Sequence, residues 1–372
     1  MKNLQFKPLN YIFNFLVVLF IAIPIFEASA TVVVGSAITA FATGTVLSFS
    51  NISKNIAFMA LNVEIWNKTI QEKLVTDNTF LQHVANVDAG NILNGSIVHL
   101  PQAGNPSNVV KNRTVLPAAI STRTDSEVLY KIDEYTTDPI RVKHSDTVEM
   151  PYDKRRSILD QDVLNLSEEV AEGMLFNFID SPIGNNKSLP LANILSTDSA
   201  TTVSPYGVGK TGNRKAYRLN DLQRMRNFMV YAKAWSEGNM YAMLTPEAAV
   251  QMFPAESAIT ATYMQAASEA ERRAGIIYKA SGWNILIRSS VYNLTGAKAF
   301  KPNDALNAAD DTEGCLFWNK NMLEKAIGKT EVFERLKDPT FYGDIFSLLV
   351  RMGGRARRKN YEGVGVLIQA NA

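Results

Sequence analysis

Cysteine and histidine are scarce in this sequence, and their scarcity narrows the chemistry that it can carry. Cys315 is the only cysteine among 372 residues, and the three histidines, His83, His99 and His144, lie far apart. A single cysteine excludes an intramolecular disulfide and argues against a zinc site built on cysteine. Histidines that form no close pair give little support to a metal enzyme or to a cysteine–histidine nucleophile.

The chain also lacks an excess of charge of either sign. It has 38 lysines and arginines against 36 acidic residues, a net charge of +2, and 46% hydrophobic residues. This composition is typical of a soluble globular protein and excludes a disordered chain, a collagen-like chain and a multi-span transporter. A nearly neutral chain is not built as a polycation that coats nucleic acid. The length predicts one or two domains.

Common catalytic motifs are missing as well, including a GxSxG elbow and an HExxH pair. Gly207–Thr211 resembles the end of a phosphate-binding loop, but Ser204 stands where that pattern requires a glycine. Neither a buried strand before this segment nor a helix after it is expected. We therefore predict no nucleotide site, no cofactor and no enzymatic activity, and we expect Cys315 to be a small core residue.

The one long apolar stretch lies near the N-terminus, in residues 11–49. Its first run ends in the small residues Ala28–Ala30, which is the outline of a secretory signal peptide. Its second run, Thr31–Phe49, has little charge and about the length of a marginal membrane span. A third interpretation is an apolar extension that packs against itself or against other subunits.

Two predicted strands enclose a long polar segment. Ile97–Leu100 is a short apolar strand, and Val128–Val142 is an extended segment interrupted at Asp138 and Pro139. The polar segment between them predicts a two-stranded excursion with a flexible tip of little apolar content. An isolated two-stranded hairpin is marginally stable in water, and no third strand is evident beside it. We expect its missing contacts on another copy of the chain; a mobile surface loop is the alternative.

The strongest predicted helix runs from Asp153 to Ile179 and is expected to be a structural spine. Its apolar residues recur at intervals of three and four, which places them on one face. These are Val163, Leu166, Val170, Met174 and Phe178.

The region from residue 219 to 346 alternates between helical and extended patterns, which predicts a mixed α/β region. Asn220 and Gln223 suggest a variant capping box, and Thr245 is expected to cap a helix that begins at Pro246. The expected elements are a helix from Leu219, a strand at Met240–Leu244, a helical region at 257–274, strands at Trp283–Arg288 and Leu316–Trp318, and an amphipathic stretch through Ile327. Val364–Ile368 is a further apolar strand.

The clearest charge feature is a basic cluster near the C-terminus, in which Gly353 and Gly354 are expected to break the backbone. The cluster consists of Arg351, Arg355, Arg357, Arg358 and Lys359. Arginine suits both carboxylates and phosphates, so ion pairing between subunits and contact with phosphate both remain open.

The order of these parts resembles the major capsid proteins of tailed double-stranded-DNA phages, whose Hong Kong 97-type fold is shared with encapsulins. Several stretches are most similar to the version found in phages of Bacteroidetes-type bacteria. They are Val98–Gly104, Arg123–Asp125, Tyr130–Pro139, Tyr152–Arg155 and Phe341–Phe346, followed by Arg351, Gly354, Arg355, Gly363 and Val364. The similarity covers residues 60–372.

The resemblance implies an α+β fold with an N-terminal arm, an extended β-hairpin loop, a long spine helix, and peripheral and axial domains. The implied divisions are an apolar extension at 1–50, the arm at 51–96, the extended loop at 97–142, a peripheral domain at 143–189 and 346–372, and an axial domain at 190–345. The apolar extension departs from the charged, helical scaffolding extension of many family members.

The resemblance also implies a structural function without a catalytic site: self-assembly into an icosahedral head that encloses phage DNA. The implied assembly-interface residues are Arg113, Arg123, Tyr130, Tyr135, Arg155, Arg351, Arg355, Arg357 and Arg358. Copies of the chain are expected to form hexamers and pentamers, located in the virion and, during assembly, in the host cytoplasm. Further expected partners are portal, scaffold or decoration proteins, packaged DNA through non-specific contact, and a membrane contacted transiently by residues 11–49. The alternative is a secreted or membrane-anchored bacterial surface protein.

Overall fold

The computed structural model divides the chain into two units, residues 1–68 and 69–372. It describes residues 78–87, 92–93, 97–143 without 105, 115, 119 and 121, 154–179, and 188–372 without 303 and 304. The expectations for the apolar extension at 1–50, for the membrane contact of residues 11–49 and for most of the arm lie outside these residues. Among the described residues, no helix combines the length and apolarity needed to cross a membrane.

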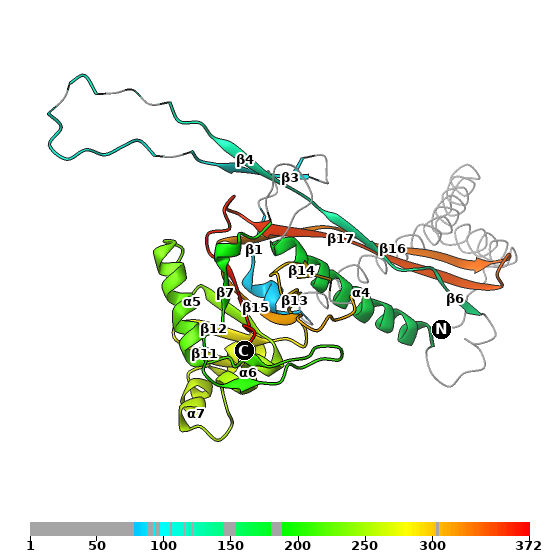
Figure 1. The fold of residues 1–372 in the computed structure, drawn as a ribbon. Coiled ribbons are helices and arrows are strands. Elements are labelled where there is room, and N and C mark those ends of the chain that lie inside the picture. Colours follow the sequence, from blue (N-terminus) through cyan, green and yellow to red (C-terminus); the bar gives the residue numbers. More distant parts are fainter. Residues whose placement is uncertain are drawn as a thin grey trace, which may run out of the picture. The chain divides into compact units, whose positions relative to one another are not determined.

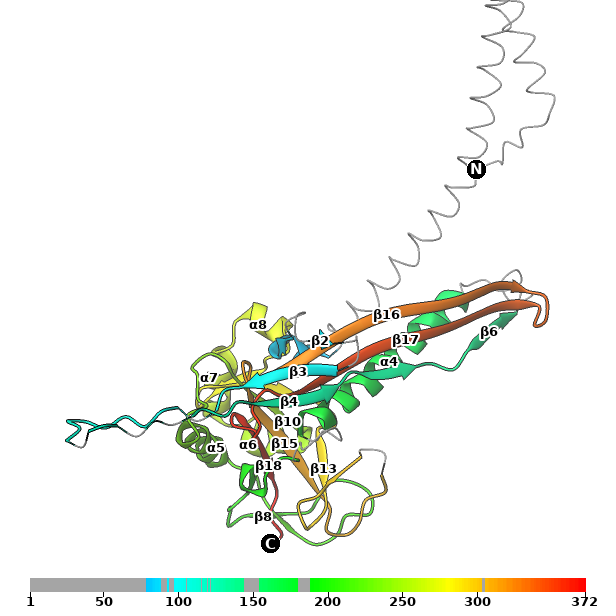
Figure 2. The same cartoon turned by 90° about the horizontal axis from the view of Figure 1, so that it is seen from above.

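A long antiparallel hairpin organises one sheet of the second unit. Strand β16 (Leu323–Asp338) pairs with β17 (Gly343–Ala356) along nearly their whole lengths, as Figures 1 and 2 show. The sequence did not predict this hairpin, which we call the central hairpin. On its two edges lie β1 (Ala85–Asn86), parallel to β16, and β5 (Asp133–Thr136) and β6 (Ile140–Lys143), both antiparallel to β17.

The predicted spine helix is present as α4 (Lys154–Ile179), which packs against β17 and β5. Its predicted apolar stripe is buried from Val163 to Phe178, which confirms the interpretation of the spacing. Tyr135 of β5 lies over Gly173, where a side-chain carbon would overlap the tyrosine hydroxyl. Asn177 donates a hydrogen bond to Asp133 at 2.6 Å and ties the helix to the same strand.

Gly353 and Gly354 lie inside β17 and do not break it, contrary to the expectation from sequence. A side-chain carbon at Gly353 would stand 2.7 Å from the carbonyl oxygen of Lys131. One at Gly354 would stand 2.7 Å from the methyl group of Met174 on α4. Real carbon atoms do not approach this closely, so the two glycines let the neighbouring segments pack directly on the strand.

A second sheet contains most of the remaining strands of the described residues. Its order is β11 (Tyr278–Ala280), β12 (Trp283–Ile287), β10 (Met240–Leu244), β15 (Thr312–Asn319), β13 (Tyr292–Leu294) and β14 (Phe300–Lys301). Strand β18 (Val364–Ile368) also pairs with β15 and, on its other side, with β7 (Ile194–Ser196). We call this the eight-stranded sheet. The bounds predicted for β10 and β18 are confirmed.

Two implied domain boundaries do not coincide with the sheets. The C-terminal strand β18 pairs within the eight-stranded sheet, whereas the resemblance grouped it with the spine helix. The boundary implied between residues 345 and 346 falls inside β17. Because β17 pairs with β16, residues 323–345 belong structurally with the central hairpin.

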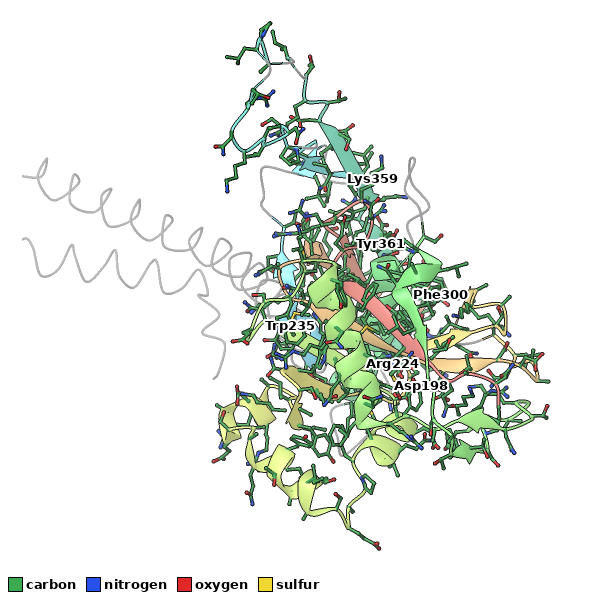
Figure 3. The ribbon with its side chains drawn as sticks, turned by 60° about the vertical axis from the view of Figure 1, so that its left-hand side comes forward. Asp198, Arg224, Trp235, Phe300, Lys359 and Tyr361 are labelled. Atoms are coloured by element: carbon green, nitrogen blue, oxygen red, sulfur yellow. The ribbon has the colours of Figure 1, made fainter. Side chains whose placement is uncertain are left out.

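Short helices cover the eight-stranded sheet, namely α5 (Leu219–Tyr231), α6 (Pro246–Met252), α7 (Ala258–Gln265) and α8 (Glu269–Arg273). The N-cap residue of α5 is Arg218, and its backbone amide donates to the side chain of Asp221 in the first turn at 3.0 Å, so the predicted capping pair was wrong. Thr245 caps α6 as predicted, accepting the Ala248 amide at 3.4 Å. On α5, Arg224 pairs with Asp198 at 3.3 Å. Figure 3 shows the two labelled residues next to each other.

Two 3-10 helices lie in the described residues, η1 (Thr79–His83) and η3 (Leu191–Asn193), and β8 (Thr202–Val203) pairs with β9 (Arg214–Lys215). A last sheet contains β2 (Ile92–Leu93), β3 (Ile97–Gln102) and β4 (Ser126–Lys131). It forms the base of the predicted excursion.

Candidate assembly interface

The predicted excursion is a ribbon formed by β3, β4 and the residues between them, 103–125. The two strands pair antiparallel from Ile97 with Lys131 to Gln102 with Ser126. Strand β2 adds two residue pairs on the outer side of β3, so a short third strand exists where none was expected. Figures 1 and 2 show the described part of the tip extending beyond these strands.

The root of the ribbon is buried within its own chain. Val98, Leu100, Val128 and Tyr130 point to one face and pack together with Ala326 of the central hairpin. This alternation is the signature of a strand with one buried face. The root therefore needs no contact with another molecule, and it holds the rest of the ribbon in place.

The tip of the ribbon, residues 106–122, is different, because every described residue in it is exposed. Val109, Leu116 and Ile120 are 91%, 77% and 99% exposed, so the tip has more unburied apolar surface than the sequence suggested. Full burial of one such side chain contributes about 1.5–3 kcal/mol. Lys111 and Arg113 are the charged residues of this segment, so the tip is both apolar and positive.

Two of the sequence motifs meet at the neck between root and tip. Asp125 accepts a hydrogen bond from the Gly104 amide at 2.8 Å and pairs with Arg123 at 2.6 Å. These hydrogen bonds lower the pKa of Asp125, the one from Arg123 most strongly. A side-chain carbon at Gly104 would overlap the carbonyl oxygen of Thr124, so only glycine permits this approach of the two strands.

A buried carboxylate, Glu324 of β16, joins the ribbon root to the central hairpin. The Tyr130 hydroxyl donates to one of its oxygens at 2.9 Å, and the Arg357 guanidinium donates to the other at 2.7 Å. Burial raises the pKa of Tyr130, and the Glu324 charge adds to this effect. Gln102 of β3 donates in turn to the Arg357 carbonyl at 2.7 Å. A buried carboxylate with two donors is stable there, whereas one that loses a partner is strongly destabilising.

The basic cluster near the C-terminus is divided between the interior and the surface. Arg355 is fully buried and donates to the Tyr361 hydroxyl at 3.3 Å. Tyr130, another residue predicted for the interface, is also buried. Arg351 is mostly buried beside Glu134, at 3.8 Å. Arg357 is partly exposed, and Arg358 is exposed. Lys359 is exposed as well, so Arg357, Arg358 and Lys359 are the members of this cluster that present surface to a partner.

The other residues predicted for the interface occupy four different places. Arg113 lies on the exposed tip and Arg123 at the neck. Tyr135 is partly buried against α4, and burial together with the Asp133 and Glu169 charges raises its pKa to about 12. Arg155 lies in the first turn of α4, and its side chain is outside the described residues. The fold therefore does not gather the predicted residues into one patch.

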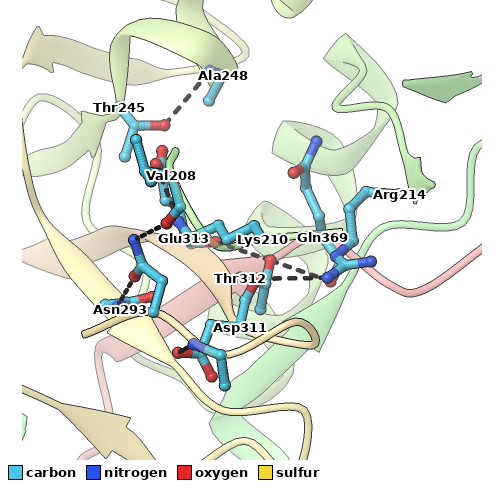
Figure 4. A network of polar contacts seen from close by, with 12 residues as sticks. Val208, Lys210, Arg214, Thr245, Ala248, Asn293, Asp311, Thr312, Glu313 and Gln369 are labelled. Atoms are coloured by element: carbon cyan, nitrogen blue, oxygen red, sulfur yellow. Dashed lines mark hydrogen bonds and ion pairs between the residues drawn. The ribbon is translucent and has the colours of Figure 1, made fainter. Parts of the chain in front are cut away.

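The loop that resembles a phosphate-binding segment is part of a polar network in Figure 4. Lys210 is buried and pairs with Glu313 at 3.3 Å, while Arg214 donates to the Ala309 carbonyl at 2.8 Å. Lys301 pairs with the buried Asp311 at 2.5 Å. The loop joins two short antiparallel strands, β8 and β9, which is not the strand-to-helix setting of a phosphate site.

Neither the single cysteine nor the acidic residues indicate reaction chemistry. Cys315 is buried, and burial raises its pKa to about 12, so the thiol is a core residue as predicted. Among the described residues, no group of histidine, cysteine, aspartate and glutamate side chains is arranged to hold a metal ion.

Comparison with known proteins gives similarity in structure only. No protein-family model matches the chain, and no curated protein matches it. The capsid of Ralstonia phage GP4 superposes with a TM-score of 0.55 at 11% identity, over 78% of this chain and 87% of that one. The capsid of cyanophage P-SCSP1u gives 0.50 at 15% identity, over 78% and 86%. A virus-like particle from Pyrococcus furiosus gives 0.46 at 12% identity, over 82% and 99%, too weak a match to support an argument.

The first two matches show the fold of the chain. They cover most of both chains, so the central hairpin, spine helix and eight-stranded sheet belong to one known architecture. The α+β capsid fold expected from the order of sequence motifs is thereby confirmed.

Proposed function

We propose that this chain is the major capsid protein of a tailed double-stranded-DNA phage. It is a structural subunit without catalytic activity, and copies of it form the hexamers and pentamers of an icosahedral head around the DNA. The observation that carries the proposal is the ribbon tip, on which Val109, Leu116 and Ile120 are exposed although the root is firmly anchored. An anchored apolar surface of this kind marks a protein-binding site.

The partner of the tip is a second copy of the chain, and the outer face of α4 is the surface that suits it. Glu168 and Glu169 are exposed there, off the buried stripe, and Leu164 beside them is 52% exposed. Lys111 and Arg113 of the tip have the opposite sign. Charges of opposite sign on two surfaces speed their encounter and fix their register.

The remaining expectations from sequence belong to this proposal. The exposed Arg358 and the partly exposed Arg357 contribute to contacts between subunits, and packaged DNA is contacted without sequence preference. Portal, scaffold and decoration proteins are further partners, and residues 11–49 contact a membrane transiently. The protein is located in the virion and, during assembly, in the host cytoplasm. The fold offers no support for the alternative of a bacterial surface protein.

Charge reversal tests both the proposal and the pairing of the two surfaces. The full chain is expressed and examined by size exclusion and negative-stain electron microscopy, where we expect closed shells or capsomers. Lys111→Glu with Arg113→Glu, and separately Glu168→Lys with Glu169→Lys, are expected to abolish large assemblies. The combined four-residue variant is expected to restore them.

Thermal unfolding of each variant separates loss of assembly from loss of folding. We expect the four substituted positions to leave the melting temperature of the subunit nearly unchanged, because all of them are exposed. A chain that stays monomeric under every assembly condition would refute the capsid function. Shells that survive both charge reversals would refute only the pairing of the tip with α4.

A further inference from the structure

Two consecutive residues of β16, Glu324 and Lys325, hold two different segments of the chain on opposite faces of the strand. Neighbouring side chains of a strand point to opposite faces, so one residue can serve each side. Glu324 faces the ribbon root and Lys325 faces residues 78–87, which we call the N-terminal segment. Both side chains are at least 94% buried, since 1% and 6% of the two residues are exposed.

On its face, Lys325 binds the 3-10 helix of the N-terminal segment. Its ammonium group donates a hydrogen bond to the carbonyl oxygen of Leu81. Burial lowers the pKa of Lys325 to about 8, and the charge of Lys320 acts in the same direction. A charge-assisted hydrogen bond in a dry setting is stronger than a neutral one. Leu81 is itself completely buried, so this contact docks the helix onto β16.

His83 makes the second set of contacts between this 3-10 helix and the rest of the chain. The imidazole contacts the Ala274 carbonyl at 3.0 Å and stacks on Tyr241 with the ring centres 4.5 Å apart. Trp318 donates to the His83 carbonyl at 3.0 Å. The N-terminal segment is therefore a docked element with a defined position.

The backbone of the N-terminal segment contacts the same two residues. Strand β1 aligns Ala85 with Glu324 and Asn86 with Lys325, and the Val87 amide donates to the Lys325 carbonyl at 2.9 Å. On the other face, Glu324 holds Tyr130 and Arg357. At these two residues β16 is thus hydrogen-bonded both to the N-terminal segment and to the ribbon root.

We propose that Glu324 and Lys325 couple the N-terminal segment to the ribbon, so that docking of the N-terminal segment on β16 fixes the position of the ribbon root. A slip of β16 by one residue would exchange the two buried side chains between faces, which leaves each charge without its partner. The register of this strand therefore carries the coupling, beside two direct contacts: Val87 packs on the apolar cluster of the root, and Arg357 donates to the Asn86 carbonyl at 3.5 Å. Because coupling free energy is reciprocal, loosening either segment must loosen the other.

Hydrogen exchange of the full chain tests this coupling with Lys325→Met. Methionine keeps the length of the side chain but removes the hydrogen bond to Leu81, and no described ribbon residue loses a contact with Lys325. We expect amides of the N-terminal segment to exchange roughly tenfold faster or more, as befits loss of one hydrogen bond from a charged donor. Amides of β3 and β4 are expected to exchange faster as well.

Lys210→Met is the matched control, because Lys210 is also buried and charged but lies beside the eight-stranded sheet. It is expected to leave exchange in β3 and β4 unchanged. Faster exchange in the N-terminal segment alone would overturn the coupling. Equal acceleration of the ribbon by both variants would also overturn it, because the effect would then reflect general destabilisation.

The reverse experiment uses Glu324→Gln, which keeps the shape of the side chain and weakens the ribbon contact. Faster exchange is then expected at residues 78–87 as well as in the ribbon root, and an unchanged N-terminal segment would contradict the proposal. This variant also answers the question if Lys325→Met fails to fold. All variants are compared in one assembly state, so the outcome does not depend on the proposed capsid function.

Discussion

Apolar side chains are buried in the eight-stranded sheet and exposed at the ribbon tip. Trp283 and Phe317 of the sheet are completely buried and pack edge to face, 5.0 Å between ring centres. Ile120 of the tip is 99% exposed although it is just as apolar. The sheet obtains its packing partners from its own chain, and the tip does not. The difference indicates which part of the molecule is complete alone and which part requires a second copy.

The ribbon root lies between these extremes, because its stability depends on polar contacts as well as packing. Tyr130 and Glu324 form a buried hydrogen bond beside the apolar cluster of Val98 and Val128. The root transmits the position of the central hairpin to the tip.

The largest effect is expected for Phe317→Ala in the eight-stranded sheet. Removing a buried aromatic ring leaves a cavity, and the expected loss is about 3–5 kcal/mol of unfolding free energy. Urea denaturation of the purified chain measures it, with Leu116→Ala at the tip as the control. A loss below 1 kcal/mol would mean that the sheet is not the complete core described here.

An intermediate effect is expected for Tyr130→Phe at the ribbon root. Glu324 then loses one of its two donors while the packing of the ring is preserved, which costs about 1.5–3 kcal/mol. Tyr342→Phe is the control, because Tyr342 is 81% exposed and should change nothing. If the two variants unfold at the same urea concentration, the buried hydrogen bond does not stabilise the root.

A smaller, pH-dependent effect is expected from Lys325. Its folded-state pKa of about 8 lies below the ordinary value of 10.5, so between these values the unfolded chain binds more protons. The free energy of unfolding therefore rises with pH across this window. Lys325→Met lacks this titration, so the difference between wild type and variant is expected to grow from pH 8 to pH 10. A constant difference would show that burial does not shift this amine.

The smallest effect on folding is expected for serine at Val109, Leu116 and Ile120 together. Exposed side chains contribute little to subunit stability, so the unfolding free energy should stay within about 0.5 kcal/mol. Large assemblies are nevertheless expected to disappear in electron micrographs. A clear loss of subunit stability would mean that the tip packs on its own chain, and the comparison with the sheet would fail.

Several elements were predictable because their signal lies in neighbouring residues. The apolar stripe of α4, the strands β10 and β18 and the Thr245 cap all follow from local spacing. The central hairpin was not predictable in this way. Residues 323–338 mix charged and apolar side chains, and what makes them a strand is pairing with β17 and burial of residues such as Glu324 and Lys325.

The candidate site shows the same division. The sequence indicated a protruding ribbon and a group of arginines, but it did not show that Arg355 and Tyr130 are internal while Arg113 is exposed. Nor did it show that Gly104, Arg123 and Asp125 meet at the neck. Contacts between residues far apart in the chain depend on how whole elements pack, and this packing cannot be read from local composition.

The sequence by itself determined the spine helix, the excursion and the absence of metal or disulfide chemistry based on cysteine, because each depends on residue type and short-range periodicity. Only the tertiary structure decided that the root of the ribbon is buried and its tip is not. Burial depends on the neighbours that each side chain finds in space. For the tip, the described residues of its own chain provide none.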